Sequence, residues 1–97
     1  MTIENPKDGF DLIEYPCDYG FKAMCRVDVN DSQSASDAIQ QLVFQHVDQS
    51  ALIETHVHQS RTGKFESVTV TIRIENRELL EAIYKSIAES SRVVMTL

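Results

Sequence analysis

Cysteine, proline, glycine and tryptophan are all scarce in the sequence, which has two cysteines, two prolines, three glycines and no tryptophan. Two cysteines are too few for the disulfide framework of a small secreted domain, and no N-terminal signal with an apolar centre is present. No apolar run approaches the ~18 residues that a membrane-spanning helix needs. We therefore expect a cytoplasmic protein whose thiols are reduced.

Positive charge is also scarce. The sequence has nine Lys and Arg residues and fifteen Asp and Glu residues, which give a net charge of -6. A negative field repels phosphate backbones and anionic lipid heads. Nucleic acid and membranes are therefore poor partners. A basic protein or a cationic ligand fits the net charge better.

The length of 97 residues predicts one domain. Residues 1–11 are polar and show no sustained period, so they are expected to form a flexible N-terminal arm. Residues 12–97 are expected to form a single domain with its own core.

Strands are predicted wherever apolar residues alternate with polar ones. In the first strand the inward set begins just after Asp18 and comprises Tyr19, Phe21, Ala23, Cys25, Val27 and Val29. The second strand, residues 52–59, is expected to turn Ile53 and Val57 inward. A loop over residues 60–64 joins it to a third strand over residues 65–75, and Gly63 can adopt the left-handed conformation that such a loop needs. Residues 92–97 are expected to form the last strand.

Two helices are predicted from apolar residues at spacings of three and four. The first helix begins with Ser34 or Ser36 as its N-cap, and its stripe comprises Ala35, Ala38, Ile39, Leu42, Val43, His46 and Val47. The second follows Asn76 as its cap, and its buried stripe comprises Leu79, Leu80, Ile83, Tyr84 and Ile87.

This order of elements predicts an α+β, ferredoxin-like β-α-β-β-α-β fold, with two helices on one face of a four-stranded antiparallel sheet. The first and third strands should be central. The other sheet face is then left open. The residues expected on this open face are Lys22, Met24, Arg26, His56, His58, Thr69, Thr71 and Arg73. Such a face can dimerise, take a ligand or simply be solvated.

Four segments together resemble a known family. They are residues 12–16 (LIEYP), 21–24 (FKAM), 60–70 (SRTGKFESVTV) and 93–97 (VVMTL). Their order and spacing resemble the YbeD-like family, small bacterial proteins that are sometimes labelled lipoate regulatory proteins. The resemblance implies a ferredoxin-like fold similar to the ACT regulatory domains, and it implies no catalytic residues. Cys25 departs from the pattern, in which a small residue, often glycine, follows the Lys-Ala-Met stretch.

Metal binding is disfavoured by the residues. His56 and His58 lie two apart on a strand and so project from one face, but two ligands are too few for a specific site. His46 belongs to the helical layer on the opposite side of the sheet. Cys25 lies on the core face and is expected to act as a small buried hydrophobe. We expect no metal and no cofactor.

Two other classes with this topology fit poorly. Acyl phosphatases need a glycine-containing anion loop after the first strand, whereas residues 29–33 (VNDSQ) are acidic and lack glycine. RNA-binding domains of this topology expose aromatics on the first and third strands. Here Phe65 is the available aromatic, although Lys22, Arg26 and Arg73 can form a local basic patch.

The sequence therefore predicts a non-enzymatic regulatory or adaptor module, a monomer or weak homodimer, that binds a protein partner through the open sheet face. The alternative is an ACT-like small-molecule sensor. In such domains the turn after the first strand receives the ligand, and the residues at that place are Asn30, Asp31 and Ser32. The same residues are ordinary at a helix start.

Overall fold

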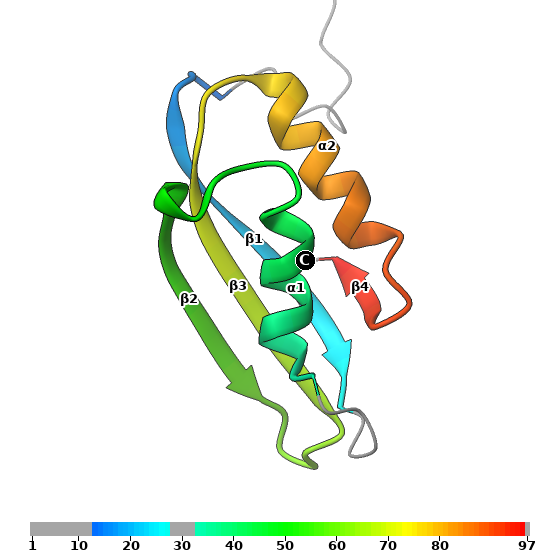
Figure 1. Ribbon diagram of the computed structural model, residues 1–97. Helices are drawn as coiled ribbons and strands as arrows, with labels where there is room; N and C mark the ends of the chain where they lie inside the picture. Colours follow the sequence, from blue (N-terminus) through cyan, green and yellow to red (C-terminus); the bar gives the residue numbers. More distant parts are fainter. Residues whose placement is uncertain (1–12, 28–32, 97) are drawn as a thin grey trace, which may run out of the picture.

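The computed structural model describes residues 13–27 and 33–96. Figure 1 shows one sheet with helices packed in front of it. In chain order the elements are β1 (Cys17–Arg26), α1 (Ala35–Val43), the 3-10 turn η2 (Gln49–Ala51), β2 (Leu52–Gln59), β3 (Phe65–Ile74), α2 (Arg77–Ala88) and β4 (Val93–Thr96). The expected β-α-β-β-α-β order is confirmed, and η2 is an addition that the sequence pattern did not predict.

The four strands form one antiparallel sheet in the order β2-β3-β1-β4. β1 and β3 are central, as predicted. They pair without interruption from Cys17 opposite Ile74 to Arg26 opposite Phe65. Both helices lie on the same face of the sheet (Figure 1). This is the ferredoxin-like arrangement.

The core lies between the helices and the sheet. It takes alternate residues from β1 and β3 and the apolar stripe of each helix. Its fully buried members include Phe21, Ala23, Cys25, Ile39, Val43, Val68, Val70, Ile72, Ile74, Leu80, Ile83 and Ile87. Burial of this apolar area is the main favourable term in folding.

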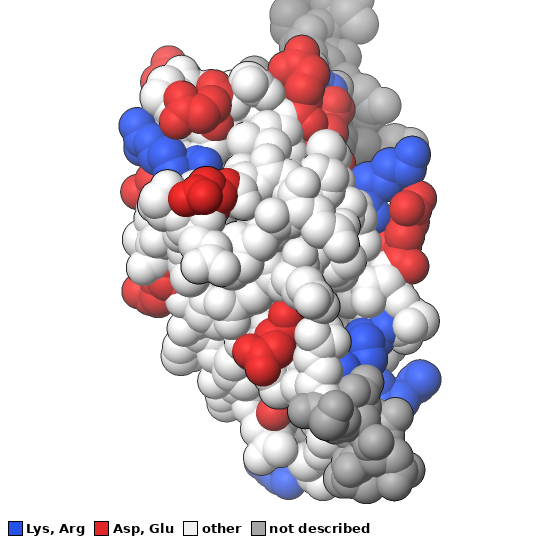
Figure 2. Space-filling model, in the orientation of Figure 1, with Lys and Arg blue, Asp and Glu red and all other residues white. Residues whose placement is uncertain are grey.

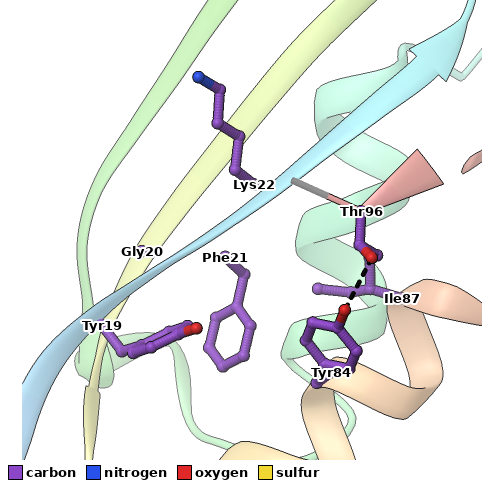
Figure 3. A pocket seen from close by; sticks show the side chains of 7 residues that line it. All are labelled: Tyr19, Gly20, Phe21, Lys22, Tyr84, Ile87 and Thr96. Carbon is purple, nitrogen blue, oxygen red and sulfur yellow. Dashed lines mark hydrogen bonds between the residues drawn. The ribbon is translucent and has the colours of Figure 1, made fainter. Parts of the chain in front are cut away.

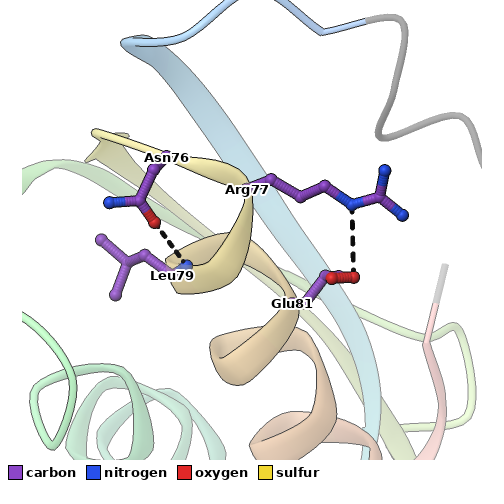
Figure 4. Close-up of polar contacts among 4 residues, drawn as sticks. All are labelled: Asn76, Arg77, Leu79 and Glu81. Atoms are coloured by element: carbon purple, nitrogen blue, oxygen red, sulfur yellow. Dashed lines mark hydrogen bonds and ion pairs between the residues drawn. The ribbon is translucent and has the colours of Figure 1, made fainter.

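The start of each helix is capped by the side chain that precedes it. The Ser34 hydroxyl accepts a hydrogen bond from the N–H of Asp37 at 3.0 Å. The Asn76 side-chain oxygen accepts one from the N–H of Leu79 at 2.9 Å (Figure 4). These bonds satisfy backbone donors that have no partner within the helix.

The first helix is shorter than predicted. Its apolar stripe continues to Val47, but α1 ends at Val43. The next amides bond three residues back, from Gln45 to Leu42 and from His46 to Val43, so the chain tightens into a turn. Val47 still packs against the core, which explains why the apolar spacing extends beyond the helix.

The inward assignment of Ile53 was wrong. A register shift lies between Leu52 and Glu54, so Leu52 pairs with Ile72 on the core side and Ile53 is 51% exposed. A β-bulge of this kind changes the side to which the following residues point. Val57 does lie on the core side, opposite Val68, but it is 42% exposed because β2 is an edge strand.

Tyr84 is another departure, since it was predicted within the buried stripe of α2 but is 37% exposed. It lies at the margin of the helix stripe, beside β4. Several predictions concern residues outside the described ranges. They are the arm over residues 1–11, the end of the first strand at Val29, and the ligand-loop residues Asn30, Asp31 and Ser32.

Candidate functional site: the open face of the sheet

On the sheet face opposite the helices, the register of the strands determines which side chains are neighbours. Paired residues in a sheet share a face. Lys22 on β1 lies opposite Thr69 on β3, which in turn lies opposite His56 on β2. All eight residues predicted on the open face lie on it. Each is paired with another residue of this face or alternates along β1 with the core residues. Their positions are thus confirmed, whereas their role stays a prediction.

Met24 lies on the central strand β1, towards the end of this face where β1 finishes. It lies opposite Ser67 on β3 and Met95 on β4, and Ser67 lies opposite His58 on β2. Met95 is 50% exposed, and Met24 is partly buried. Two thioether side chains therefore lie next to each other, and Phe65, opposite Arg26, adds an aromatic ring to the same face.

Met95 is a site residue that the sequence did not reveal. β4 has four residues, and its pairing with β1 is irregular next to Met24. Four residues carry too little alternation to show which face each side chain takes. Only the register with β1 places Met95 beside Met24.

Cations flank the methionines on β1. Lys22 and Arg26 lie two residues to either side of Met24, so all three side chains point to the same face. Both cations are exposed, and within the described part of the chain neither forms an ion pair. We call Lys22, Met24, Arg26, His58 and Met95 the methionine patch.

The other end of the open face holds an ion pair. Arg73 lies opposite Asp18, and its guanidinium donates to the carboxylate at 3.1 Å. Glu54 lies nearby, opposite Thr71. Arg73 is therefore engaged by Asp18 and lies away from the methionine patch, so the predicted grouping of Arg73 with Lys22 and Arg26 does not form one basic patch.

A shallow hollow lies beside the patch, at the end of the β2–β3 hairpin. It is lined by Arg26, Val27, Gly63, Lys64 and Phe65. Gly63 has a φ of 77°, as the loop prediction required, and its N–H donates to the carbonyl of Ser60 at 3.0 Å. The hollow extends the cationic end of the open face.

The histidines divide as predicted. His56 and His58 lie exposed on the open face, whereas His46 lies on the helical side, with its Nε2 2.8 Å from the Ser86 hydroxyl. In the described part of the chain no three His, Cys, Asp or Glu side chains gather into a metal-ligating group. The absence of a metal remains a prediction.

The two cysteines are free thiols. Cys25 is fully buried in the core, as predicted. Its burial raises the pKa of the thiol, Arg92 opposes this shift, and Glu66 adds to it. A buried thiol held in its neutral form is a poor nucleophile.

With this geometry established, the chain can be compared with other proteins. Residues 11–97 match the family model described as "Protein of unknown function (DUF493)". The chain belongs to this family. UPF0250 protein NE1487 of Nitrosomonas europaea is 31% identical over 86 residues, which cover 89% of this chain and 94% of that protein. UPF0250 protein NMC1112 of Neisseria meningitidis serogroup C is 27% identical over 97 residues and spans all of both chains. The resemblance to YbeD-like proteins is confirmed.

Among solved structures, the solution structure of protein HP0495 from H. pylori is similar. It has a TM-score of 0.68 and 21% sequence identity, and the match covers 88% of this chain and 85% of that chain. At this identity the likeness shows a shared fold. Neither described helix is long and apolar enough to span a bilayer.

Proposed function

We propose that this protein is a non-enzymatic regulatory or adaptor module that binds a protein partner through the methionine patch. The observation that carries the proposal is the pairing of Met24 with Met95 on a sheet face that no described helix covers. Methionine is flexible and polarisable, and it is common on surfaces that adapt to a partner. Large apolar side chains gathered on such a face mark an interaction site.

The positive charges beside the methionines favour a partner that carries acidic residues around its contact surface. Lys22 and Arg26 carry positive charge, and the described carboxylates of this face, Asp18 and Glu54, lie towards its other end. The patch is thus locally positive although the chain has a net charge of -6. Complementary charge at the rim of an interface guides association and fixes orientation.

A Ser–His pair raises the question of catalysis. His46 and Ser86 have the separation of a base and a nucleophile, 2.8 Å. Both are partly buried in the helical layer, and the described hollows are lined by other residues. A nucleophile needs a place for the reacting group beside it. The pair therefore favours a structural role, and the proposal assigns no reaction to the chain.

The test compares capture of partners by immobilised variants. Met24→Glu places a charge at the centre of the patch, and Met24→Leu keeps it apolar. Thr71→Glu is the matched control, because it places the same charge on the same face but in another row. Proteins from an extract of the source organism are identified by mass spectrometry for each variant.

A protein captured by wild type, Met24→Leu and Thr71→Glu but lost with Met24→Glu supports the proposal. Equal capture by wild type and Met24→Glu contradicts it. Each variant is first checked by thermal unfolding, so that loss of binding is not confused with loss of fold.

A further inference from the structure

β4 is too short to cover the edge of β1. It pairs with Ala23, Met24 and Cys25, whereas β1 begins at Cys17. Along residues 17–21 no described strand lies on this side of β1. Figure 3 shows β1 running past the tip of β4, with α2 beside the two strands. Among the described residues, therefore, no strand covers the first half of this edge, which we call the free edge of β1.

The backbone groups that face this free edge follow from two hydrogen bonds. The N–H of Arg26 donates to Arg92, next to β4, and the N–H of Val27 donates to Lys64, next to β3. Backbone groups alternate between the two sides along a strand. Since the β1–β3 ladder is uninterrupted, the N–H and C=O of Asp18 and Gly20 point to the free edge.

Both residues are exposed. Exposed strand edges with open N–H and C=O groups are templates for an added strand. Only an extended backbone repeats donors and acceptors at the two-residue spacing that Asp18 and Gly20 present.

A small hollow lies beneath the edge, on the helical side. Tyr19 and Phe21 of β1 line it together with Tyr84 of α2 and Thr96 of β4 (Figure 3). The hydroxyls of Tyr84 and Thr96 lie 2.8 Å apart and close it towards β4. The cavity volume is ≈ 10 Å³, room for about one water. An added strand can therefore place a small side chain here.

The surroundings of the free edge are acidic. β1 and α2 begin at the same end of the molecule, because Cys17 pairs with Ile74 just before α2. Exposed carboxylates at this end are Glu14, Glu75 and Glu78. Figure 2 shows carboxylates over the start of α2.

The cations at the same end are already bound to other carboxylates. Arg73 binds Asp18 at 3.1 Å, and Arg77 binds Glu81 at 3.3 Å (Figure 4). The described part of this end therefore carries excess negative charge, in line with the net charge of -6.

We propose that the free edge of β1 takes up an extended basic segment of a partner protein as an additional strand, end to end with β4. Backbone bonds to Asp18 and Gly20 hold the segment, a small side chain lies over the hollow, and basic side chains meet the acidic end. This surface shares Lys22, which lines the hollow, with the methionine patch, but its backbone bonds are to Asp18 and Gly20, so it does not rest on the function proposed above.

The probe is a capped heptapeptide, Lys-Thr-Lys-Ala-Lys-Thr-Lys. A second peptide has glutamate in place of each lysine, and a third has N-methyl groups on the two middle lysines, whose N–H groups would face β1. Binding to the full ¹⁵N-labelled chain is followed by the amide signals in two-dimensional NMR. The basic peptide is expected to shift the signals of Asp18 and Gly20 and to slow their exchange with solvent.

Variants then test the role of charge. Replacing Glu14, Glu75 and Glu78 together by Gln is expected to weaken binding about eightfold at low salt, since each charge at ~10 Å contributes about a factor of two. The matched control neutralises Asp37, Glu66 and Glu89, which lie towards the other end of the sheet. It includes a first-turn helix carboxylate, Asp37, as the counterpart of Glu78.

The inference is overturned if the basic peptide shifts neither signal, if the acidic or N-methylated peptide binds as well as the basic one, or if both triple variants weaken binding equally. Met24→Glu separates this surface from the methionine patch, because it is expected to leave peptide binding unchanged. Loss of peptide binding in folded Met24→Glu protein would also overturn the placement at the edge.

Discussion

The Nε2 atom of His46 lies 2.8 Å from the hydroxyl of Ser86, and the contact joins the turn after α1 to the last turn of α2. Both side chains are partly buried. Since the two residues are forty positions apart in the chain, the bond fixes the helices relative to each other.

Ser86→Ala is expected to lower the free energy of unfolding by about 1–2 kcal/mol, because it leaves the partly buried imidazole without this partner. Urea denaturation measures the change. The control is Ser91→Ala, at an exposed serine in the turn before β4. Equal stabilities of the two variants would show that the bond contributes nothing.

Asp48 caps η2, and its carboxylate accepts a hydrogen bond from the N–H of Ser50 at 2.9 Å. Bonds from Ser50 lower the pKa of Asp48 below 3.8. A pKa lowered in the folded state means that the stabilisation is present above 3.8 and is lost as the pH falls through the folded value.

Asp48→Ala is therefore expected to melt below wild type at pH 7 and to approach it in acid. Asp48→Asn keeps an oxygen that can accept the bond, so its difference from wild type should vary less with pH. Thermal unfolding across the acid range measures both. A deficit of Asp48→Ala that persists unchanged below the folded pKa contradicts the assignment.

Much of the fold could be predicted because its signals are local and repeated. Ten residues of alternation identify β1 and β3, and a capping side chain precedes each helix. Gly63 marked the hairpin because few residues other than glycine adopt its φ of 77° without strain.

The features that the sequence analysis got wrong or missed share a different cause, since they depend on contacts between residues far apart in the sequence. The bulge that exposes Ile53 is set by the pairing of β2 with β3. Likewise, Met95 joins Met24 only through the pairing of β4 with β1. The open face could thus be predicted strand by strand, but not the methionine pair on it or the free edge that the short β4 leaves.

The buried thiol of Cys25 makes a second prediction about pH. Burial raises the pKa of Cys25 above 9.0 in the folded chain. The neutral thiol therefore stabilises the fold below pH 9.0, and this contribution is lost as the pH rises from there towards the folded pKa.

The difference in unfolding free energy between wild type and Cys25→Ala is expected to shrink above pH 9.0. Urea denaturation of both proteins at a series of alkaline pH values measures it. Cys17 is present in both proteins and cancels from the comparison. A difference that stays constant or grows with pH would contradict a buried neutral thiol.

The division of β1 into a core face and an open face gives the last prediction. Ala23 is fully buried, and its neighbour Met24 points to the open face. Ala23→Glu places a charge in the core, where Lys22 and Arg26 cannot reach it because they lie on the open face. It is expected to lower the free energy of unfolding by more than about 3 kcal/mol and to prevent cooperative folding. Met24→Glu keeps its carboxylate in contact with water between Lys22 and Arg26, so it is expected to change stability by less than about 1 kcal/mol. Circular dichroism during urea denaturation distinguishes the two, and similar losses in both variants would mean that Met24 belongs to the core rather than to a binding surface.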